Sequence, residues 1–217
     1  MFTNSSNFTN SVDSLFLYIL ILSAIVLVGL TVAMIYFVIR YSRKRNPVPK
    51  QIEGNLTLEI LWTAIPLALF MSMFYFGWVQ YSEMRAIPED AVPIKVTARM
   101  WQWSFEYPNG LKTDTLYLPV STPVRADLHS ADVNHAFFIP AFRVKKDVYA
   151  NRNNNLWFKS DKVGRYDIAC AEYCGLNHSY MYSAVYIMEQ KDFTAWLDTA
   201  SARAGVKPFF KTTAEKK

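Results

Sequence analysis

The uncharged stretch Leu15–Ile39, LFLYILILSAIVLVGLTVAMIYFVI, decides how the first part of the chain folds. A helix rises about 1.5 Å per residue, so these 25 residues can cross a hydrocarbon core of about 30 Å with some tilt. A second uncharged run of 22 residues covers 60–81. Both runs exceed the roughly 18 residues that separate a membrane helix from a buried helix of a soluble protein. The pair predicts a two-helix transmembrane hairpin.

The first run is also too long for the apolar part of a signal peptide, and no basic residue precedes it, which favours a retained helix. The connection between the runs is basic, and the positive-inside bias places it in the cytoplasm. Its basic residues are Arg40, Arg43, Lys44, Arg45 and Lys50. The outer side is then the periplasm of a bacterium, or the intermembrane space if the membrane is the mitochondrial inner membrane. The expected segments are an external start (1–14), a first span (15–41), a cytoplasmic loop (42–57), a second span (58–84), an outer domain (92–205) and a polar tail (206–217).

The outer domain has the alternating and β-branched pattern of short strands separated by turns, which indicates a small β-sandwich or barrel. The expected strands include Ile94–Val96, Leu116–Pro119, Val124–Leu128, Leu156–Phe158 and Ser183–Ile187, and Asn153–Asn155 is expected to be a loop. A closing helix is expected at Lys191–Ala204. Residues 92–217 carry 17 basic and 12 acidic side chains, a dispersed surplus of 17 − 12 = +5. A nucleic-acid interface would need a clustered basic stripe, so no nucleic-acid partner is expected.

Two thiols, an imidazole and a thioether fall within twelve residues, in the sequence CAEYCGLNHSYM at 170–181. A disulfide between Cys170 and Cys174 would close a very small loop and remove little chain entropy, so a chemical role is the better interpretation. Thiolate, imidazole and thioether are soft ligands that suit copper, and zinc sites rarely use Met. The spacing allows both thiolates to bridge two metal ions.

Two metal ions need a second imidazole, because His178 cannot cap both. The remaining histidines are His129 and His135, and His135 opens an aromatic stretch that would shield a redox centre from water. Singly, each of these residues is more often structural: Met181 alone would be core filler, and Trp101 alone an ordinary buried aromatic. Glu59, at the cytoplasmic start of the second run, is open to two readings, a functional carboxylate or an interfacial acid that stays wet.

Three motifs together resemble subunit II of the cytochrome c oxidase family, which holds a binuclear copper centre called CuA. They are LEILWTAIP at 58–66, MWQWSFEY at 100–107 and the C-x-E-x-C-x-x-x-H-x-x-M loop at 170–181. The similarity covers roughly 15–197. It implies a transmembrane hairpin followed by an all-β, cupredoxin-like Greek-key barrel with a short C-terminal helix.

The resemblance also implies a role for each site residue. Cys170 and Cys174 would bridge two coppers, and His135 and His178 would each cap one. Met181 and the backbone carbonyl of Glu172 would complete the two coordination spheres. The Glu172 side chain would point toward a magnesium shared with subunit I.

Two further residues match positions with roles in the family. Trp101 matches the residue through which electrons enter, and Glu59 matches a glutamate at the mouth of a proton pathway. The implied partners are subunit I with its haem and CuB, subunit III, the membrane and a cytochrome c-type donor. Electrons would pass from the donor to CuA and then to haem in subunit I, where oxygen is reduced to water with coupled proton transport.

Acidic residues near Trp101 are few, and we count Glu106, Asp114 and Asp132. Weak steering of basic donors is therefore expected. The stretch VYANR at 148–152 departs from the Pro-Gly turn common in the family, and only a local loop change is expected. Two other classes of protein are alternatives: a membrane-tethered copper-binding or copper-delivery protein with no oxidase partner, and the copper domain of a nitrous oxide or nitric oxide reductase, which shares the copper loop. The latter lacks the motif at 58–66.

Overall fold

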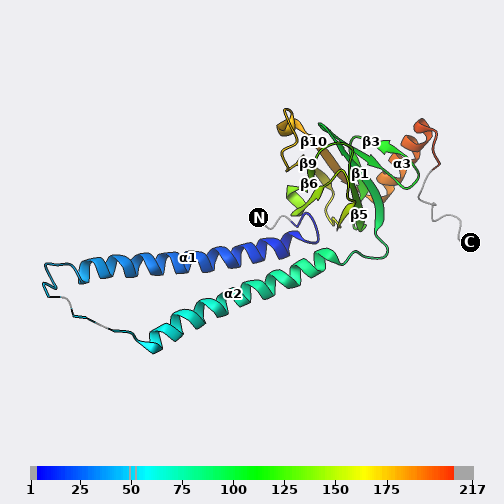
Figure 1. Ribbon diagram of the computed structural model, residues 1–217. Coiled ribbons are helices and arrows are strands. Elements are labelled where there is room, and N and C mark those ends of the chain that lie inside the picture. Colours follow the sequence, from blue (N-terminus) through cyan, green and yellow to red (C-terminus); the bar gives the residue numbers. More distant parts are fainter. Residues whose placement is uncertain (1–3, 49, 52, 208–217) are drawn as a thin grey trace, which may run out of the picture. The chain divides into compact units, whose positions relative to one another are not determined.

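The computed structural model describes residues 4–48, 50–51 and 53–207 (Figure 1). These residues form two compact units. One unit consists of Asp13–Tyr81, and the other combines the N-terminal residues up to Val12 with the chain from Ser82 onward.

The first unit is built from two long helices, α1 (Thr9–Arg40) and α2 (Leu56–Arg85). The Tyr18 hydroxyl lies 2.6 Å from the Ser72 hydroxyl, and the Tyr18 ring packs edge-on against Phe76 with centroids 5.6 Å apart. Most other apolar side chains of both helices remain exposed. Helices that are apolar on all sides are typical of membrane spans, which agrees with the predicted hairpin.

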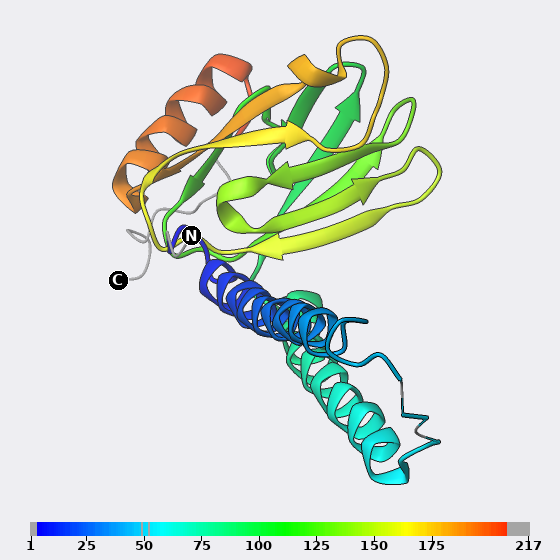
Figure 2. The same ribbon diagram turned by 90° about the vertical axis from the view of Figure 1, so that its left-hand side faces the viewer.

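The second unit is a β-sandwich of two five-stranded sheets (Figure 2). The first sheet has the order β3-β2-β1-β5-β8, and its strands are Lys112–Thr113, Gln102–Glu106, Val92–Arg99, Val124–Ser130 and Asn154–Phe158. The second has the order β4-β10-β9-β6-β7, with strands Leu116–Pro119, Tyr182–Met188, Gly164–Cys170, His135–Ile139 and Val144–Val148. β1 pairs with β5 and β10 with β4 in parallel, whereas the other pairs are antiparallel.

Alternation along the strands sends every second side chain into the core between the sheets. In β1, Ile94, Val96 and Ala98 are at most 1% exposed, while the residues between them face outward. β6 differs, because it is buried along nearly its whole length and carries Phe137 into the core. His135, a predicted metal ligand, is the first residue of this buried strand.

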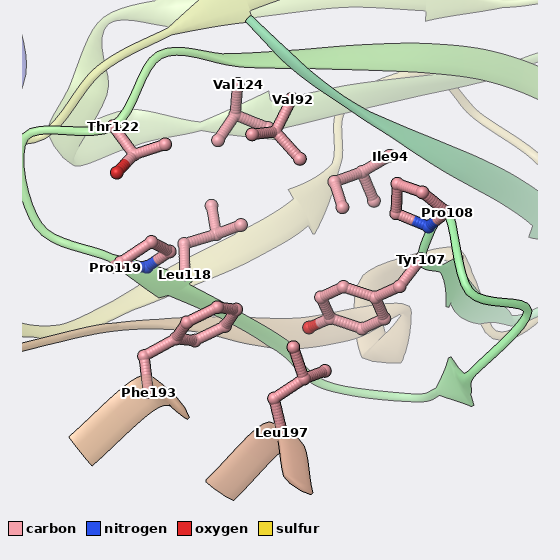
Figure 3. A pocket seen from close by; sticks show the side chains of 10 residues that line it. All are labelled: Val92, Ile94, Tyr107, Pro108, Leu118, Pro119, Thr122, Val124, Phe193 and Leu197. Atoms are coloured by element: carbon pink, nitrogen blue, oxygen red, sulfur yellow. The ribbon is translucent and has the colours of Figure 1, made fainter. Parts of the chain in front are cut away.

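Helix α3 (Gln190–Ala204) closes one end of this core. Phe193 and Leu197 point from the helix into an apolar pocket that also receives the Tyr107 ring (Figure 3). The helix ends at Gly205, whose φ of 69° gives the left-handed cap typical of helix C-termini.

The N-terminal residues are fastened to the sandwich. The Phe8 ring is 4% exposed and packs edge-on against Trp157 with centroids 4.9 Å apart. Two hydrogen bonds join Asn7 to Lys159: the Asn7 N–H donates to the Lys159 carbonyl, and the Lys159 N–H donates to the side-chain oxygen Oδ1 of Asn7. We call residues 5–9 the N-terminal strap.

The predicted fold class is confirmed: two apolar helices are followed by a β-sandwich with a C-terminal helix. All five expected strands lie within observed strands, and the closing helix is α3. The expected loop at Asn153–Asn155 is wrong in part, because Asn154 and Asn155 pair with β5. Ladder pairing across a neighbouring strand overrides the weak strand propensity of Asn. Most of the predicted tail, 208–217, lies outside the described residues.

Candidate metal centre

The candidate ligands come from three neighbouring strands of the second sheet. β9 ends at Cys170, and β10 begins directly after Met181. The intervening loop, seen in gold in Figure 2, contains Cys174 and a short 3-10 helix that starts at His178. β6 pairs with β9 so that Phe137 lies opposite Cys170, which brings His135 to the same end of the sheet.

The two sulfurs form the middle of the cluster. Cys170 Sγ and Cys174 Sγ lie 3.8 Å apart, and neither cysteine is in a disulfide. Cys170 Sγ is 3.7 Å from His135 Nδ1, and Cys174 Sγ is 3.5 Å from His178 Nδ1. Each thiol therefore has its own imidazole nitrogen, and the two halves of the cluster resemble each other.

Each half also has a weaker donor. Cys174 Sγ lies 3.7 Å from the Met181 thioether sulfur, and the Cys170 thiol donates to the Glu172 carbonyl oxygen at 3.3 Å. The sequence-predicted ligand set is thus brought together around the sulfur pair. His129 is elsewhere, on β5, where it lines a polar groove with Lys95 and Asp127.

The cluster is buried unevenly. His135 and Met181 are 0% exposed and the two cysteines are buried, whereas His178 is half-buried. Trp103 packs edge-on near His135 with ring centroids 6.3 Å apart. His135 therefore lies in the aromatic core, and among the two cysteines, two histidines and Met181 only the His178 side chain is partly open to solvent.

This donor set fits copper. The thiols, imidazoles and thioether are soft ligands, which exclude a magnesium or calcium preference. The sulfur separation of 3.8 Å is shorter than twice a metal–thiolate bond of about 2.3 Å, so one ion can contact both sulfurs. Burial, together with the hydrogen bond to Cys170, raises the pKa of Cys174 to about 12. The metal-free thiol is therefore protonated, and metal binding must release its proton.

Asp132 holds the outer side of His135. Its Oδ1 lies 2.8 Å from His135 Nε2, so a proton on Nε2 is donated to the carboxylate and Nδ1 keeps its lone pair for the cluster. Burial alone would raise the pKa of Asp132. Hydrogen bonds from the Met100 N–H, His135 and the Val133 N–H outweigh this effect and hold the pKa below its ordinary value. In the sequence, Asp132 stands out only as an acid near Trp101, although the Asp-x-x-His spacing at 132–135 is a signal for this contact.

Trp101 lies in the turn between β1 and β2. A Cβ placed on Gly175 would be 3.5 Å from both Cζ2 and Nε1 of the Trp101 indole, so the ring lies against the ligand loop next to Cys174. Gly175 has a φ of 115°, a backbone conformation that favours glycine. No pattern in the sequence marks Gly175 as part of the site.

The remaining predicted site residues lie apart from the cluster. Glu59 is exposed in the first turn of α2, and its carbonyl accepts a hydrogen bond from the Thr63 hydroxyl at 2.8 Å. Glu172 has an exposed side chain. Within the part of the chain that the structure describes, Glu172 belongs to no group of three or more potential metal-binding side chains.

Comparison with known proteins gives matches in both halves of the chain. Residues 1–76 match the family model "Cytochrome C oxidase subunit II, transmembrane domain", and residues 109–188 match "Cytochrome C oxidase subunit II, periplasmic domain". Cytochrome c oxidase subunit 2 of Cereibacter sphaeroides is 30% identical over 84% of this chain and 74% of its own length. The subunit of Alkalihalophilus pseudofirmus is 33% identical over 88% of this chain and 58% of its own length.

One solved structure agrees with the fold of the outer domain. The periplasmic domain of subunit II of the Bradyrhizobium japonicum cytochrome oxidase is 33% identical, with a TM-score of 0.53. The match covers 54% of this chain and 99% of that one.

Fold and site together define a class: a membrane protein with two apolar helices and an outer β-sandwich that gathers soft metal donors at one end. Within this class the chain belongs to the cytochrome c oxidase subunit II family. It is therefore a subunit of a haem–copper oxidase complex and has partner subunits in that complex.

Proposed function

We propose that this subunit accepts electrons from a cytochrome c-type donor at a binuclear CuA centre and passes them to haem in subunit I. Oxygen is reduced to water in subunit I, with coupled proton transport. The observation that carries the proposal is the sulfur pair, 3.8 Å apart, with one imidazole nitrogen beside each sulfur. A mononuclear copper site needs only one thiolate and does not account for this doubled arrangement.

The contacts support a role for each ligand. Cys170 and Cys174 would hold the two coppers between them, and His135 and His178 would each supply Nδ1 as a further donor. Met181 and the Glu172 carbonyl act as the weak donors. When bound, two coppers at this site would supply a one-electron carrier, with the charge change shared through both sulfurs. The buried cluster resists rearrangement, because His135, Cys174 and Met181 are at most 4% exposed.

Electrons enter at Trp101, whose indole contacts the ligand loop beside Cys174. Glu59 serves as the entry of a proton pathway, and the Glu172 side chain binds a magnesium shared with subunit I. The further partners are CuB-containing subunit I and subunit III. The outer domain faces the periplasm of a bacterial inner membrane, or the intermembrane space in a mitochondrion.

Copper stoichiometry and the electron-spin spectrum of the full-length chain, purified in detergent and loaded with copper, test the proposal. The expected result is two coppers per chain that share one unpaired electron. Cys174→Ser is expected to abolish the shared-electron spectrum, whereas His129→Ala, which alters the histidine outside the cluster, should preserve it. A single copper per wild-type chain, or a mononuclear spectrum, would overturn the proposed function.

A further inference from the structure

We infer that Asp132 is a positioning residue that fixes the Trp101 turn and the ligand His135 to each other. Asp132 Oδ1 lies 2.8 Å from His135 Nε2, and Oδ2 accepts the Met100 N–H at 2.7 Å. The inference rests on the proposed function, because it assigns meaning to the path between Trp101 and the copper ligands.

The two partners of this carboxylate come from different sheets. Met100 follows β1 in the first sheet, and His135 begins β6 in the second. A hydrogen bond to the Met100 backbone fixes the turn immediately before Trp101. A hydrogen bond to His135 fixes the orientation of a ring whose other nitrogen faces Cys170. One side chain thus sets the position of both the entry residue and a ligand.

Asp132 is itself held firmly. Oδ1 also accepts the Val133 N–H at 2.7 Å, and the Asp132 N–H donates to the Ser130 hydroxyl at 3.2 Å. The Ala131 N–H donates to the Ala98 carbonyl at 2.9 Å, which fastens this segment to β1. The Asp132 side chain is 20% exposed. Because Asp132 is restrained at several points, it can fix the positions of His135 and Met100. A mobile acid on the surface could not do this.

The chemistry of these contacts requires a carboxylate. Both partners are donors, a backbone N–H and a ring N–H, and the two oxygens of an ionised Asp accept both. An Asn at 132 has a single side-chain oxygen, so its NH₂ group would face one of the two donors. Asp132→Asn therefore removes one of the two hydrogen bonds, to His135 or to Met100, with little change in side-chain size. Asp132→Ala removes both hydrogen bonds.

The position of the Trp101 side chain is also limited by its contact with Gly175. Asp132 holds the backbone of the turn, and Gly175 receives the indole. Electron transfer slows steeply as the gap between donor and acceptor groups widens. Releasing the turn from Asp132 is therefore expected to slow electron entry even when both coppers are bound.

The test in the assembled oxidase uses Asp132→Asn, Asp132→Ala and the control Asp127→Asn. Asp127 is an acid of the same domain, on β5, and its carboxylate pairs with the Arg125 guanidinium at 2.9 Å. Among the residues that the structure describes, it has no hydrogen bond or ion pair with a proposed copper ligand. Loss of a contact that orients a metal ligand typically costs about ten- to hundredfold in affinity or activity. We expect both Asp132 variants to reduce the rate of electron entry by about tenfold or more. The KM for the donor should change little, and Asp127→Asn should match the wild type.

A lowered rate explained only by weaker donor docking would instead raise KM and leave the maximal rate unchanged. That outcome overturns the positioning role. The electron-spin and paramagnetic NMR spectra add a second measurement, because release of Nε2 should shift the His135 ring signals and leave those of His178 in place. Unshifted His135 signals in both variants also overturn the inference.

A third measurement does not depend on copper. In the metal-free, full-length chain the Met100 amide should exchange with solvent roughly tenfold faster in Asp132→Ala than in the wild type, because its acceptor is lost. Unchanged exchange overturns the inference even if the variants fail to load copper. Conversely, the Met100 amide could exchange faster in Asp132→Ala while the copper-loaded wild type binds only one copper. That result would contradict the proposed function and still support the Asp132–Met100 contact.

Discussion

At the scale of single residues, Tyr107 shows how the core supports the site-bearing sandwich. Its hydroxyl donates to the Tyr117 carbonyl at 2.9 Å and accepts the Tyr117 N–H at 2.8 Å, in a pocket that the helix α3 covers (Figure 3). Tyr107→Phe leaves a backbone N–H and a carbonyl without this partner. We expect a loss of about 2 kcal/mol in the free energy of unfolding near pH 8, measured by denaturant unfolding of the full chain in detergent.

The same variant has a pH signature. Burial raises the pKa of Tyr107 above its ordinary value of 10.0. Above that pH the unfolded chain loses the phenolic proton and the folded chain keeps it, so stability falls as pH rises. The advantage of the wild type over Tyr107→Phe should therefore shrink by about 1.4 kcal/mol for each pH unit above 10. An advantage that stays constant between pH 8 and pH 11 would contradict this prediction.

Gly175 offers a second test at this scale, with Gly110 as its matched control. Both have a positive φ, 115° and 86°, but only Gly175 lies against Trp101, and nothing lies within 4 Å of a Cβ at Gly110. Replacing either by Ala should cost about 1 kcal/mol in stability, because the side chain disfavours this backbone conformation. Only Gly175→Ala should also slow electron entry, measured by rapid-mixing reduction of the copper centre. Equal electron-entry rates in the two variants would count against a role for this contact.

At the scale of elements, the N-terminal strap supports the outer domain. Phe8 is buried against Trp157, although it lies far from the sandwich in the sequence. Phe8→Ala is expected to reduce the stability of the outer domain by about 3 kcal/mol. The Lys159 amide, whose N–H donates to Asn7 Oδ1, should then exchange faster with solvent. Asn10→Ala, at an exposed position of α1 directly after the strap, should stay within about 0.5 kcal/mol of the wild type.

Sequence patterns predicted some of these elements and missed others for identifiable reasons. Strands such as β1 and β5 alternate between buried and exposed residues, so their period is visible. β6 is buried on both faces and carries no alternation, and β7 contains two lysines in succession. The strap was invisible because short polar residues near a chain start carry no signal for a partner more than 130 residues away. Its contacts are set only by the tertiary fold.

The candidate site likewise has parts that the sequence predicts and parts that depend on the tertiary fold. The loop ligands are close in sequence, so Cys170, Cys174 and His178 could be grouped from spacing alone. His135 joins them only because β6 lies beside β9, and the choice between it and His129 depended on its aromatic neighbours and on family resemblance. The contact of Asp132 with Met100 depends on how two loops meet, which no local pattern records.

At the scale of the whole molecule, Glu59 separates an oxidase subunit from a mere copper-carrying anchor. It is exposed near the start of α2 and lies in a unit distinct from the copper ligands. Glu59→Gln should therefore leave copper content and the electron-spin spectrum unchanged. It should lower steady-state oxygen consumption of the assembled oxidase several-fold. Glu53→Gln, an exposed acid of the connecting loop, is the matched control and should keep normal turnover. Normal turnover in Glu59→Gln would contradict the proton-entry role.

The charge of the outer domain predicts how the proposed electron donor would approach it. Residues 92–217 have a surplus of 17 − 12 = +5 positive charges, and the acids counted near Trp101 are largely engaged. Glu106 lies 3.9 Å from the Lys95 ammonium and 3.7 Å from that of Lys112, and Asp132 binds His135. A negative field that would steer a strongly basic donor is therefore weak.

The expected consequence is a shallow dependence of turnover on salt. The rate at limiting donor concentration should change little as ionic strength rises from about 0.01 to 0.15 M, a range over which the screening length falls from about 30 to 8 Å. Met100 and Leu176 are 43% and 86% exposed, and apolar contact with a donor at these residues would not depend on salt. Neutral or acidic cytochromes should therefore serve as donors at least as well as a strongly basic one. Oxygen consumption with donors of different charge checks this. The prediction is wrong if turnover is fastest with the most basic donor and falls steeply as salt is added. In that case acidic residues other than Glu106, Asp114 and Asp132 guide docking.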